Sequence, residues 1–207
     1  MTYFKNLKAA LFILAQITAV LAAKSQTTIS TLPVDGWYKI QVAQSGKYLS
    51  IENAGNENGA RLVQWDYAGG NNQKFMLKKN EDGSYSFIAA HSNKSVCANR
   101  GDNKEGDVII QNENALSQFF GKWQLQFSKQ DGCKQGWKIM YGNSGIPVQL
   151  IGDGNGASFQ LKEPQHHDGG YDCTYTYIFE PAETPLLKET IKTELRQKPG
   201  TMKKSNR

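Results

Sequence analysis

A threefold internal repeat is the feature that most constrains how this chain can fold. Three segments begin at Gly36, Gly83 and Gly136, and each opens with an aromatic residue in a short strand-like run. In each segment a small polar turn leads into a second strand, a glycine-containing loop precedes a third, and an aromatic strand ends the unit. Such a period indicates one architecture assembled from three copies of a single unit.

The composition of these units favours β structure. Residues 35–181 are rich in Gly, Asn, Gln and Ser, and few stretches recur at helical spacing, which predicts an all-β domain. A four-stranded unit of this size cannot bury its apolar side alone. Three units around a common axis can, and closure also removes exposed strand edges. We therefore predict a β-trefoil of three four-stranded repeats, with Phe75, Trp123 and Tyr177 closing a shared core.

The first 23 residues, 1–23, have the pattern of an export signal. Two lysines precede an apolar run that starts at Ala9, and small residues at Ala22 and Ala23 offer cleavage sites. The run is short and interrupted by polar residues, so no stable membrane span is expected, although a retained signal anchor is the alternative. We expect a secreted or periplasmic mature protein in which residues 24–34 form a linker.

Residues 182–207 form a basic tail. Leu187, Ile191 and Leu195 recur every four residues with Lys and Glu between them, which predicts a short amphipathic helix. A helix of about three turns is marginal unless it docks. The segment 186–198 could pack on the barrel, bind a protein partner or lie on an anionic membrane, and a frayed tail is the simplest alternative.

The positive charge lies outside the predicted domain. The formal net charge of the chain is +5, of which the first 23 residues contribute +2 and residues 181–207 contribute +4. Subtracting both leaves −1 for residues 24–180. A near-neutral domain lacks the basic surface that nucleic acid binding requires, so no nucleic acid partner is expected.

Three cysteines, Cys97, Cys133 and Cys173, allow three disulfide pairings with one thiol left over. We prefer the pair of Cys133 with Cys173, because these residues open and close the last third of the domain. The cysteine spacing resembles no metal site.

The sequence contains no strong enzymatic signal. It has no nucleophile elbow, P-loop or dinucleotide-binding motif, and no pair of carboxylates stands out for glycoside hydrolysis. His166, His167 and Asp168 lie together in a glycine-rich loop, but sequence neighbours do not converge on a metal as i,i+4 helix ligands do. We predict a protein that is not an enzyme and has no cofactor or metal site.

One stretch, 58–75, suggests a binding site. It contains a short strand that ends at Trp65, a glycine turn, and the adjacent amides Asn72 and Gln73 before an aromatic strand. Carboxamides near an exposed indole suit a polar ligand with a flat apolar face, such as a sugar. A purely structural role for Trp65 and Phe75 is the alternative.

At this point the chain resembles a known family, the ricin-B-type β-trefoil lectins, which also occur as carbohydrate-binding modules beside secreted glycoside hydrolases. The resemblance rests on the 45–51 turn, the 58–75 stretch and the threefold aromatic strand ends, and it covers roughly residues 36–180. It implies a β-trefoil in which each repeat can host a sugar in a shallow pocket. It also implies that Trp65 stacks on the sugar ring and that Asn72 and Gln73 bind hydroxyls.

The first repeat departs from the family pattern at two positions. Ser50 stands where the family has an aspartate, and Val63 stands at the usual glutamine, although Gln64 is adjacent. A neutral hydroxyl accepts weaker hydrogen bonds than a carboxylate, so the sequence does not indicate which sugar is bound. Glu52 and Asp66 are nearby carboxylates that could replace the aspartate.

The second and third repeats lack the expected pocket residues. In the second repeat these positions hold Cys97, Asn112, Phe120 and Gly121. In the third repeat they hold Gln149, Lys162, Thr174 and Tyr175. We therefore predict a secreted carbohydrate-binding, lectin-like protein with one sugar site, formed by Ser50, Gln64, Trp65, Asp66, Asn72 and Gln73. The alternative is a trefoil protein-interaction module, an inhibitor or accessory subunit, that has lost sugar binding.

Overall fold

The computed structural model describes residues 32–102, 104–115, 119–129, 133–142, 144–164 and 173–185. The chain divides into two units, Met1–Leu32 and Pro33–Arg207, and the β domain lies in the second. The predicted signal peptide at 1–23, nearly all of the predicted linker and the predicted tail helix at 186–198 lie outside the described residues.

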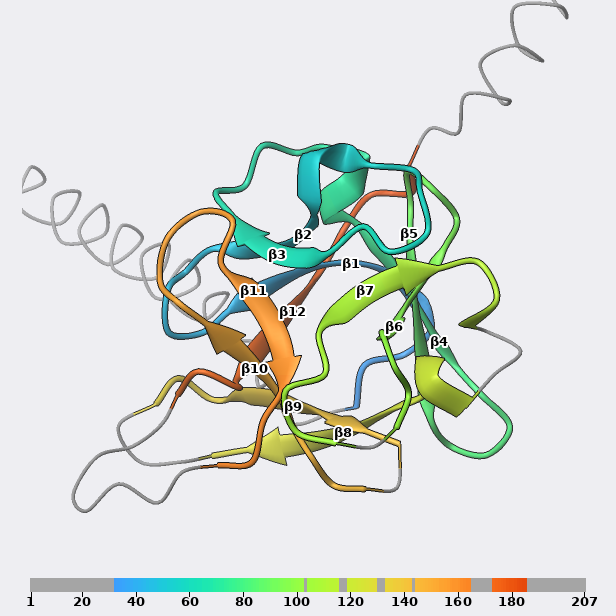
Figure 1. Ribbon diagram of the computed structural model, residues 1–207. Coiled ribbons are helices and arrows are strands. Elements are labelled where there is room, and N and C mark those ends of the chain that lie inside the picture. Colours follow the sequence, from blue (N-terminus) through green and yellow to red (C-terminus); the bar gives the residue numbers. More distant parts are fainter. Residues whose placement is uncertain are drawn as a thin grey trace, which may run out of the picture. The chain divides into compact units, whose positions relative to one another are not determined.

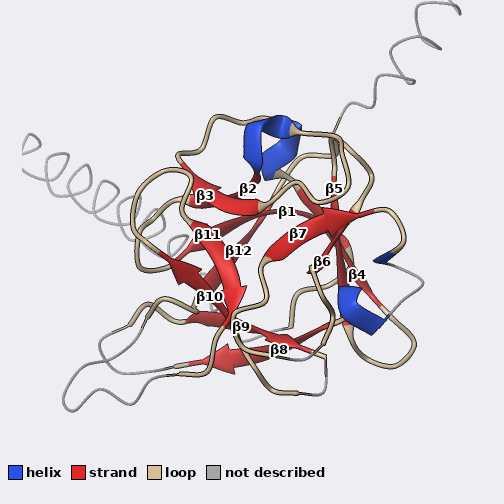
Figure 2. Cartoon of the chain, viewed as in Figure 1, coloured by secondary structure: helices blue, strands red, loops and turns tan. Residues whose placement is uncertain are grey.

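Twelve strands are present in the described part of the chain, and together they confirm the prediction of four strands in each of three repeats (Figures 1 and 2). The strands of the first repeat are β1 (Gly36–Val42), β2 (Tyr48–Ile51), β3 (Leu62–Trp65) and β4 (Phe75–Lys79). Those of the second are β5 (Tyr85–Ala89), β6 (Ser95–Ala98), β7 (Ile109–Asn112) and β8 (Trp123–Ser128). Those of the third are β9 (Gly136–Tyr141), β10 (Val148–Ile151), β11 (Ser158–Leu161) and β12 (Tyr177–Pro181).

Six strands form a closed barrel. Antiparallel pairing runs from β1 to β4, β5, β8, β9 and β12 and returns to β1, so no barrel edge is left open. The remaining strands form the hairpins β2–β3, β6–β7 and β10–β11. These hairpins are joined to one another at three contacts, Ser158 with Val63, Arg61 with Ile110, and Val108 with Gln160. This is the all-β trefoil arrangement.

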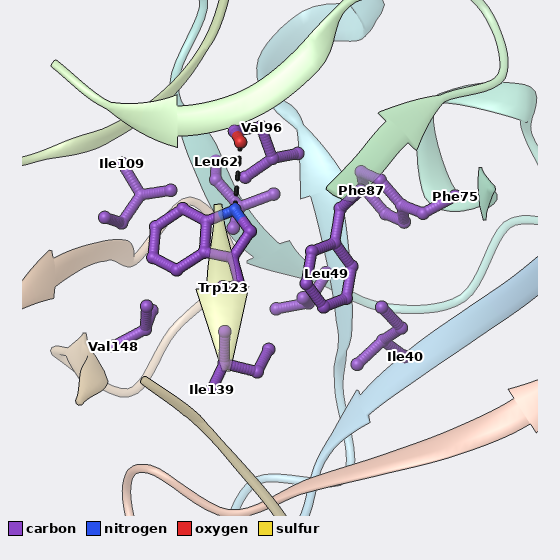
Figure 3. Close-up of a pocket in the computed structure, with 10 residues that line it drawn as sticks. All are labelled: Ile40, Leu49, Leu62, Phe75, Phe87, Val96, Ile109, Trp123, Ile139 and Val148. Carbon is purple, nitrogen blue, oxygen red and sulfur yellow. Dashed lines mark hydrogen bonds between the residues drawn. The ribbon is translucent and has the colours of Figure 1, made fainter. Parts of the chain in front are cut away.

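The core draws equivalent apolar residues from each repeat. Figure 3 shows ten of them around a cavity of about 20 Å³, which is too small for a ligand. Phe75 and Trp123 are 1% exposed and Tyr177 is 0% exposed, so their predicted core role is confirmed. The Trp123 indole donates to the Val96 carbonyl at 3.0 Å, and the Tyr177 hydroxyl donates to the Val148 carbonyl at 2.9 Å. The polar ends of both buried rings are therefore satisfied.

Cys133 and Cys173 form a disulfide with a Cα–Cα distance of 5.6 Å, which confirms the preferred pairing. Cys97 is a free, buried thiol, and burial raises its pKa to about 12. Among the described residues, no group of His, Cys, Asp and Glu side chains is arranged to hold a metal ion. His166, His167 and Asp168 lie outside them. The described residues also include no helix with the length and apolar character needed to span a bilayer.

Candidate functional site

An open pocket of about 230 Å³ lies in the first repeat, at the outer face of the β2–β3 hairpin. Its lining comes from that hairpin and from two short 3-10 helices, η1 (Glu52–Ala54) and η2 (Asn71–Gln73). The lining residues are Ser50, Glu52, Asn53, Ala54, Val63, Trp65, Ala68, Asn72 and Gln73. Of the six predicted site residues, Ser50, Trp65, Asn72 and Gln73 line this pocket, whereas Gln64 and Asp66 do not.

Strand alternation decides which side chains reach the pocket. Ser50 pairs with Val63 across the hairpin and Tyr48 pairs with Trp65, so these four side chains share one face. The intervening Gln64 points to the opposite, buried face. The pocket therefore has a floor of Ser50 and Val63 and an indole at its edge.

Trp65 is 43% exposed, which is unusual for a tryptophan in a small β domain. A β-carbon placed on Gly156 would lie 3.7 Å from Cζ3 of the indole, so the loop of the third repeat supports part of the ring. Gly156 has a φ of +85°, a conformation that favours glycine. The indole is thus held by the backbone of a neighbouring repeat while the rest of its surface is open.

Asn72 connects η2 to the pocket floor. Its Nδ2 group donates to Ser50 Oγ at 2.9 Å and to the Ile51 carbonyl at 3.1 Å. Both amide hydrogens are therefore used within the protein. The carboxamide oxygen has no hydrogen bond to any described residue and lies beside Gly70, so its acceptor capacity is unused within the described part of the protein.

Gln73 also lines the pocket but is only 2% exposed. Its Oε1 accepts from the Ala68 backbone N–H at 2.8 Å, and its Nε2 donates to the Asp66 carbonyl at 2.9 Å. These two bonds hold the turn that follows Trp65. Gln73 thus acts as a positioning residue for the indole.

The structure corrects the prediction that Gln64 belongs to the site. Gln64 is 0% exposed, and its amide donates to the carbonyls of Asp153 and Gly154 at 2.7 and 3.0 Å. Its oxygen accepts from the Ser45 hydroxyl at 2.7 Å. The Gln64 side chain is not accessible to a ligand. Its hydrogen bonds instead connect the first repeat to the third.

Asp66 is likewise outside the pocket, although it is exposed. Its carboxylate accepts from Lys47 Nζ at 2.6 Å and from Asn155 Nδ2 at 2.9 Å, while its backbone N–H donates to Asn155 Oδ1 at 3.1 Å. The hydrogen bond from Lys47 is the main cause that lowers the pKa of Asp66. Asp66 fixes the backbone beside Trp65 and does not supply the missing carboxylate.

Glu52 is the carboxylate that lines the pocket. Arg61 binds it through two hydrogen bonds, from Nε to Oε2 at 2.9 Å and from Nη2 to Oε1 at 2.6 Å, and this pairing lowers the pKa of Glu52. The next two residues, Asn53 and Ala54, have φ values of 52° and 50°. Such left-handed backbone is rare outside glycine and clusters at functional sites. Asparagine is enriched in this conformation and alanine is not, so the sequence carries a signal for the turn at Asn53 but none at Ala54.

The equivalent places in the other repeats are filled. In the second, Cys97 pairs with Ile110 across the hairpin, and these two pack in an apolar cluster with Ala115 and Phe120. A β-carbon on Gly101 would lie 2.9 Å from Cβ of Phe120, so the packing there is tight. In the third, Gln149 Nε2 donates to Thr174 Oγ1 at 2.6 Å, where the first repeat has Ser50 and Asn72.

Residues 28–112 match the family described as ricin-type β-trefoil lectin domain-like. This stretch, which ends with β7, is thus similar to a ricin-type β-trefoil lectin domain. The trefoil is similar to ThreeFoil, a designed threefold-symmetric protein, with 28% identity, a TM-score of 0.59 and coverage of 70% of this chain and 98% of that one. It is also similar to the Macrolepiota procera ricin B-like lectin, solved with lactose, with 13% identity, a TM-score of 0.58 and coverage of 74% and 100%.

One curated relative shares a shorter stretch with this lectin-like domain. Over 63 residues the chain is 39% identical to the clotting factor G alpha subunit of Tachypleus tridentatus. This match covers 30% of the present chain and 9% of that protein. The chain therefore spans only a small part of that relative's length.

Proposed function

We propose that this chain is an exported carbohydrate-binding protein, not an enzyme, with one sugar site in its first repeat. The observation that carries the proposal is the exposed Trp65 indole at the edge of a pocket with a polar floor. A sugar ring has an apolar face that stacks on an aromatic ring and hydroxyls that need hydrogen-bond partners. The lactose complex of a structurally similar lectin agrees with this ligand class.

In this proposal each lining side chain has a distinct role. Trp65 stacks on the sugar, and the free oxygen of Asn72 accepts a hydrogen bond from a hydroxyl. The Ser50 hydroxyl already donates to the Ile51 carbonyl at 3.5 Å and accepts from Asn72, so its remaining acceptor position binds a second sugar hydroxyl. Glu52, held by Arg61, supplies the ionised acceptor that the family has as an aspartate. One shallow site of this kind should bind a free sugar at roughly millimolar Kd, or about −4 kcal/mol.

The first prediction is that Trp65→Ala abolishes sugar binding without unfolding the protein. The side chain is 43% exposed, so its removal takes little from the core. A glycan array comparing the wild type with this variant provides the measurement, and quenching of tryptophan fluorescence by the bound sugar reports the same contact. The matched control is Asn112→Ala, the same position in the second repeat, which should bind like the wild type. Unchanged binding by the Trp65 variant would contradict the proposal.

A protein-interaction role is the second candidate, and the filled pockets of the second and third repeats favour it. The segment 186–198 is the proposed contact, and it lies outside the described residues. A folded wild type that binds no glycan on a broad array but captures one protein, and loses that protein when 186–198 is deleted, would support this role over sugar binding.

A further inference from the structure

Two exposed aromatic side chains lie close together in the first repeat. Trp65 is 43% exposed and Tyr67 is 42% exposed, and they are the exposed large aromatics among the described residues. The pocket accounts for Trp65 but not for Tyr67, which is absent from its lining. A tyrosine that is exposed and also held in a fixed orientation is a candidate for contact with a ligand.

Two neighbouring side chains, Tyr48 and Lys39, contact the Tyr67 ring. Its centroid lies 4.9 Å from that of Tyr48, and Lys39 Nζ lies 4.8 Å from the Tyr67 centroid. Both residues are bound to Glu180. Lys39 Nζ forms an ion pair with its carboxylate at 2.8 Å, and the Tyr48 hydroxyl donates a hydrogen bond to it at 3.1 Å. These contacts restrain the ring, and 42% of the Tyr67 side chain remains exposed.

The backbone between the two aromatics is also fixed. Gln73 binds both sides of the turn, at the Asp66 carbonyl and the Ala68 N–H. Asn155 binds the Asp66 backbone and carboxylate from the third repeat. The separation of Trp65 and Tyr67 is thus set before any ligand arrives, which lowers the entropic cost of binding to both.

Tyr67 also lies on the same side of the hairpin as the pocket. Tyr48 stands directly opposite Trp65 across β2 and β3, and it shares its face with Ser50 and Val63. Because Tyr67 packs on Tyr48, the outer face carries in succession the pocket, the Trp65 indole and the Tyr48–Tyr67 pair.

We infer that Tyr67 is a second stacking platform, so that the site takes a linear oligosaccharide with one unit at the pocket and Trp65 and a further unit on Tyr67. This inference rests on the proposed function and specifies its ligand class. A free monosaccharide contacts only the pocket and Trp65. A longer chain gains the Tyr67 contact as well.

The test is a calorimetric titration of the full chain with galactose, lactose and lacto-N-neotetraose, and with the matched mono-, di- and tetrasaccharide of any other sugar that the array identifies. Wild-type affinity should rise about threefold to tenfold from mono- to tetrasaccharide. Tyr67→Ala should remove that rise and leave monosaccharide affinity unchanged, whereas Tyr67→Phe should keep it. Trp65→Ala should abolish binding throughout each series.

The outcomes separate this inference from the proposed function. A folded wild type that binds nothing on the array overturns the proposed function and the inference with it. If the wild type binds the monosaccharide but binds the tetrasaccharide no more tightly, the inference alone is overturned. It is also overturned if Tyr67→Ala still binds the tetrasaccharide more tightly than the monosaccharide. If Tyr67→Ala does not fold, NMR of the wild type decides, because the Tyr67 ring signals should shift with the tetrasaccharide and not with the monosaccharide.

Discussion

Glu52 and Arg61 determine how the pocket responds to acid. The guanidinium hydrogen bonds favour the ionised carboxylate, so the pKa of Glu52 lies below its ordinary value of 4.5. A lowered pKa means that the pair adds stability above the ordinary pKa and loses it as the pH falls through the lowered one. Both side chains are partly exposed, so this contribution to the free energy of unfolding is under about 1 kcal/mol. The larger effect is expected on ligand binding.

We predict that sugar affinity is constant as the pH is lowered from neutral to 4.5 and declines only below that value, when Glu52 becomes protonated. In Arg61→Met the decline should begin at higher pH, because the hydrogen bonds that lower the pKa are gone. The Kd of the wild type and the variant, measured against pH, provides the comparison. Identical profiles would show that Glu52 does not contact the ligand.

Among the elements, the hairpins are connected by a repeated glutamine contact. Gln64 of β3 donates to the loop of the third repeat, and Gln111 of β7 donates to the carbonyls of Gly55 and Glu57 in the first at 2.9 and 3.0 Å. Each also accepts from a serine hydroxyl at 2.7 Å. Each amide therefore links one repeat to its neighbour, and the Gln64 link holds the loop that supports Trp65.

Removing either amide should weaken the trefoil. We predict that Gln64→Ala and Gln111→Ala each lower the free energy of unfolding by about 2 kcal/mol, because each removes a fully buried carboxamide together with its three hydrogen bonds. Gln160→Ala should cost clearly less, because Gln160 is only half-buried. Chemical denaturation of the three variants measures the difference, and an equal loss in all three would argue against the cross-repeat role.

The hairpins also show why the sequence predicts some of the residues that line the pocket and not others. The strands and aromatic ends follow from periodicity and turn residues, which are local properties. The sequence predicts Gln64 in the pocket because it neighbours Trp65. Neighbouring residues in a strand face opposite sides of the sheet, so Gln64 points into the protein interior while Trp65 faces the pocket. The left-handed backbone that follows Glu52 is only partly predictable, because asparagine is enriched in this conformation whereas alanine, at Ala54, is not.

At the scale of the whole molecule, the disulfide restrains the third repeat, the one with the longest insertion. Cys133 and Cys173 are 40 residues apart in sequence, and a closed loop of that length removes conformational entropy mainly from the unfolded chain. We predict that Cys133→Ser with Cys173→Ser lowers the free energy of unfolding by roughly 3–4 kcal/mol. Thermal unfolding with and without reductant measures the effect, and a wild type insensitive to reductant would contradict it.

The pairing of the outermost strands has a consequence for how this domain can be presented. Tyr38 of β1 lies opposite Pro181 of β12, while Val42 lies opposite Tyr177, so Gly36 and Pro181 emerge at the same end of the barrel. The β2–β3 hairpin follows β1 at its Val42 end. Polypeptide joined before Gly36 or after Pro181 would therefore leave the barrel at the end away from the turn between β1 and β2. Glu180, which contacts Lys39 and Tyr48 beside Tyr67, directly precedes Pro181, so a reporter fused before Gly36 should interfere less with glycan capture than one fused directly after Pro181.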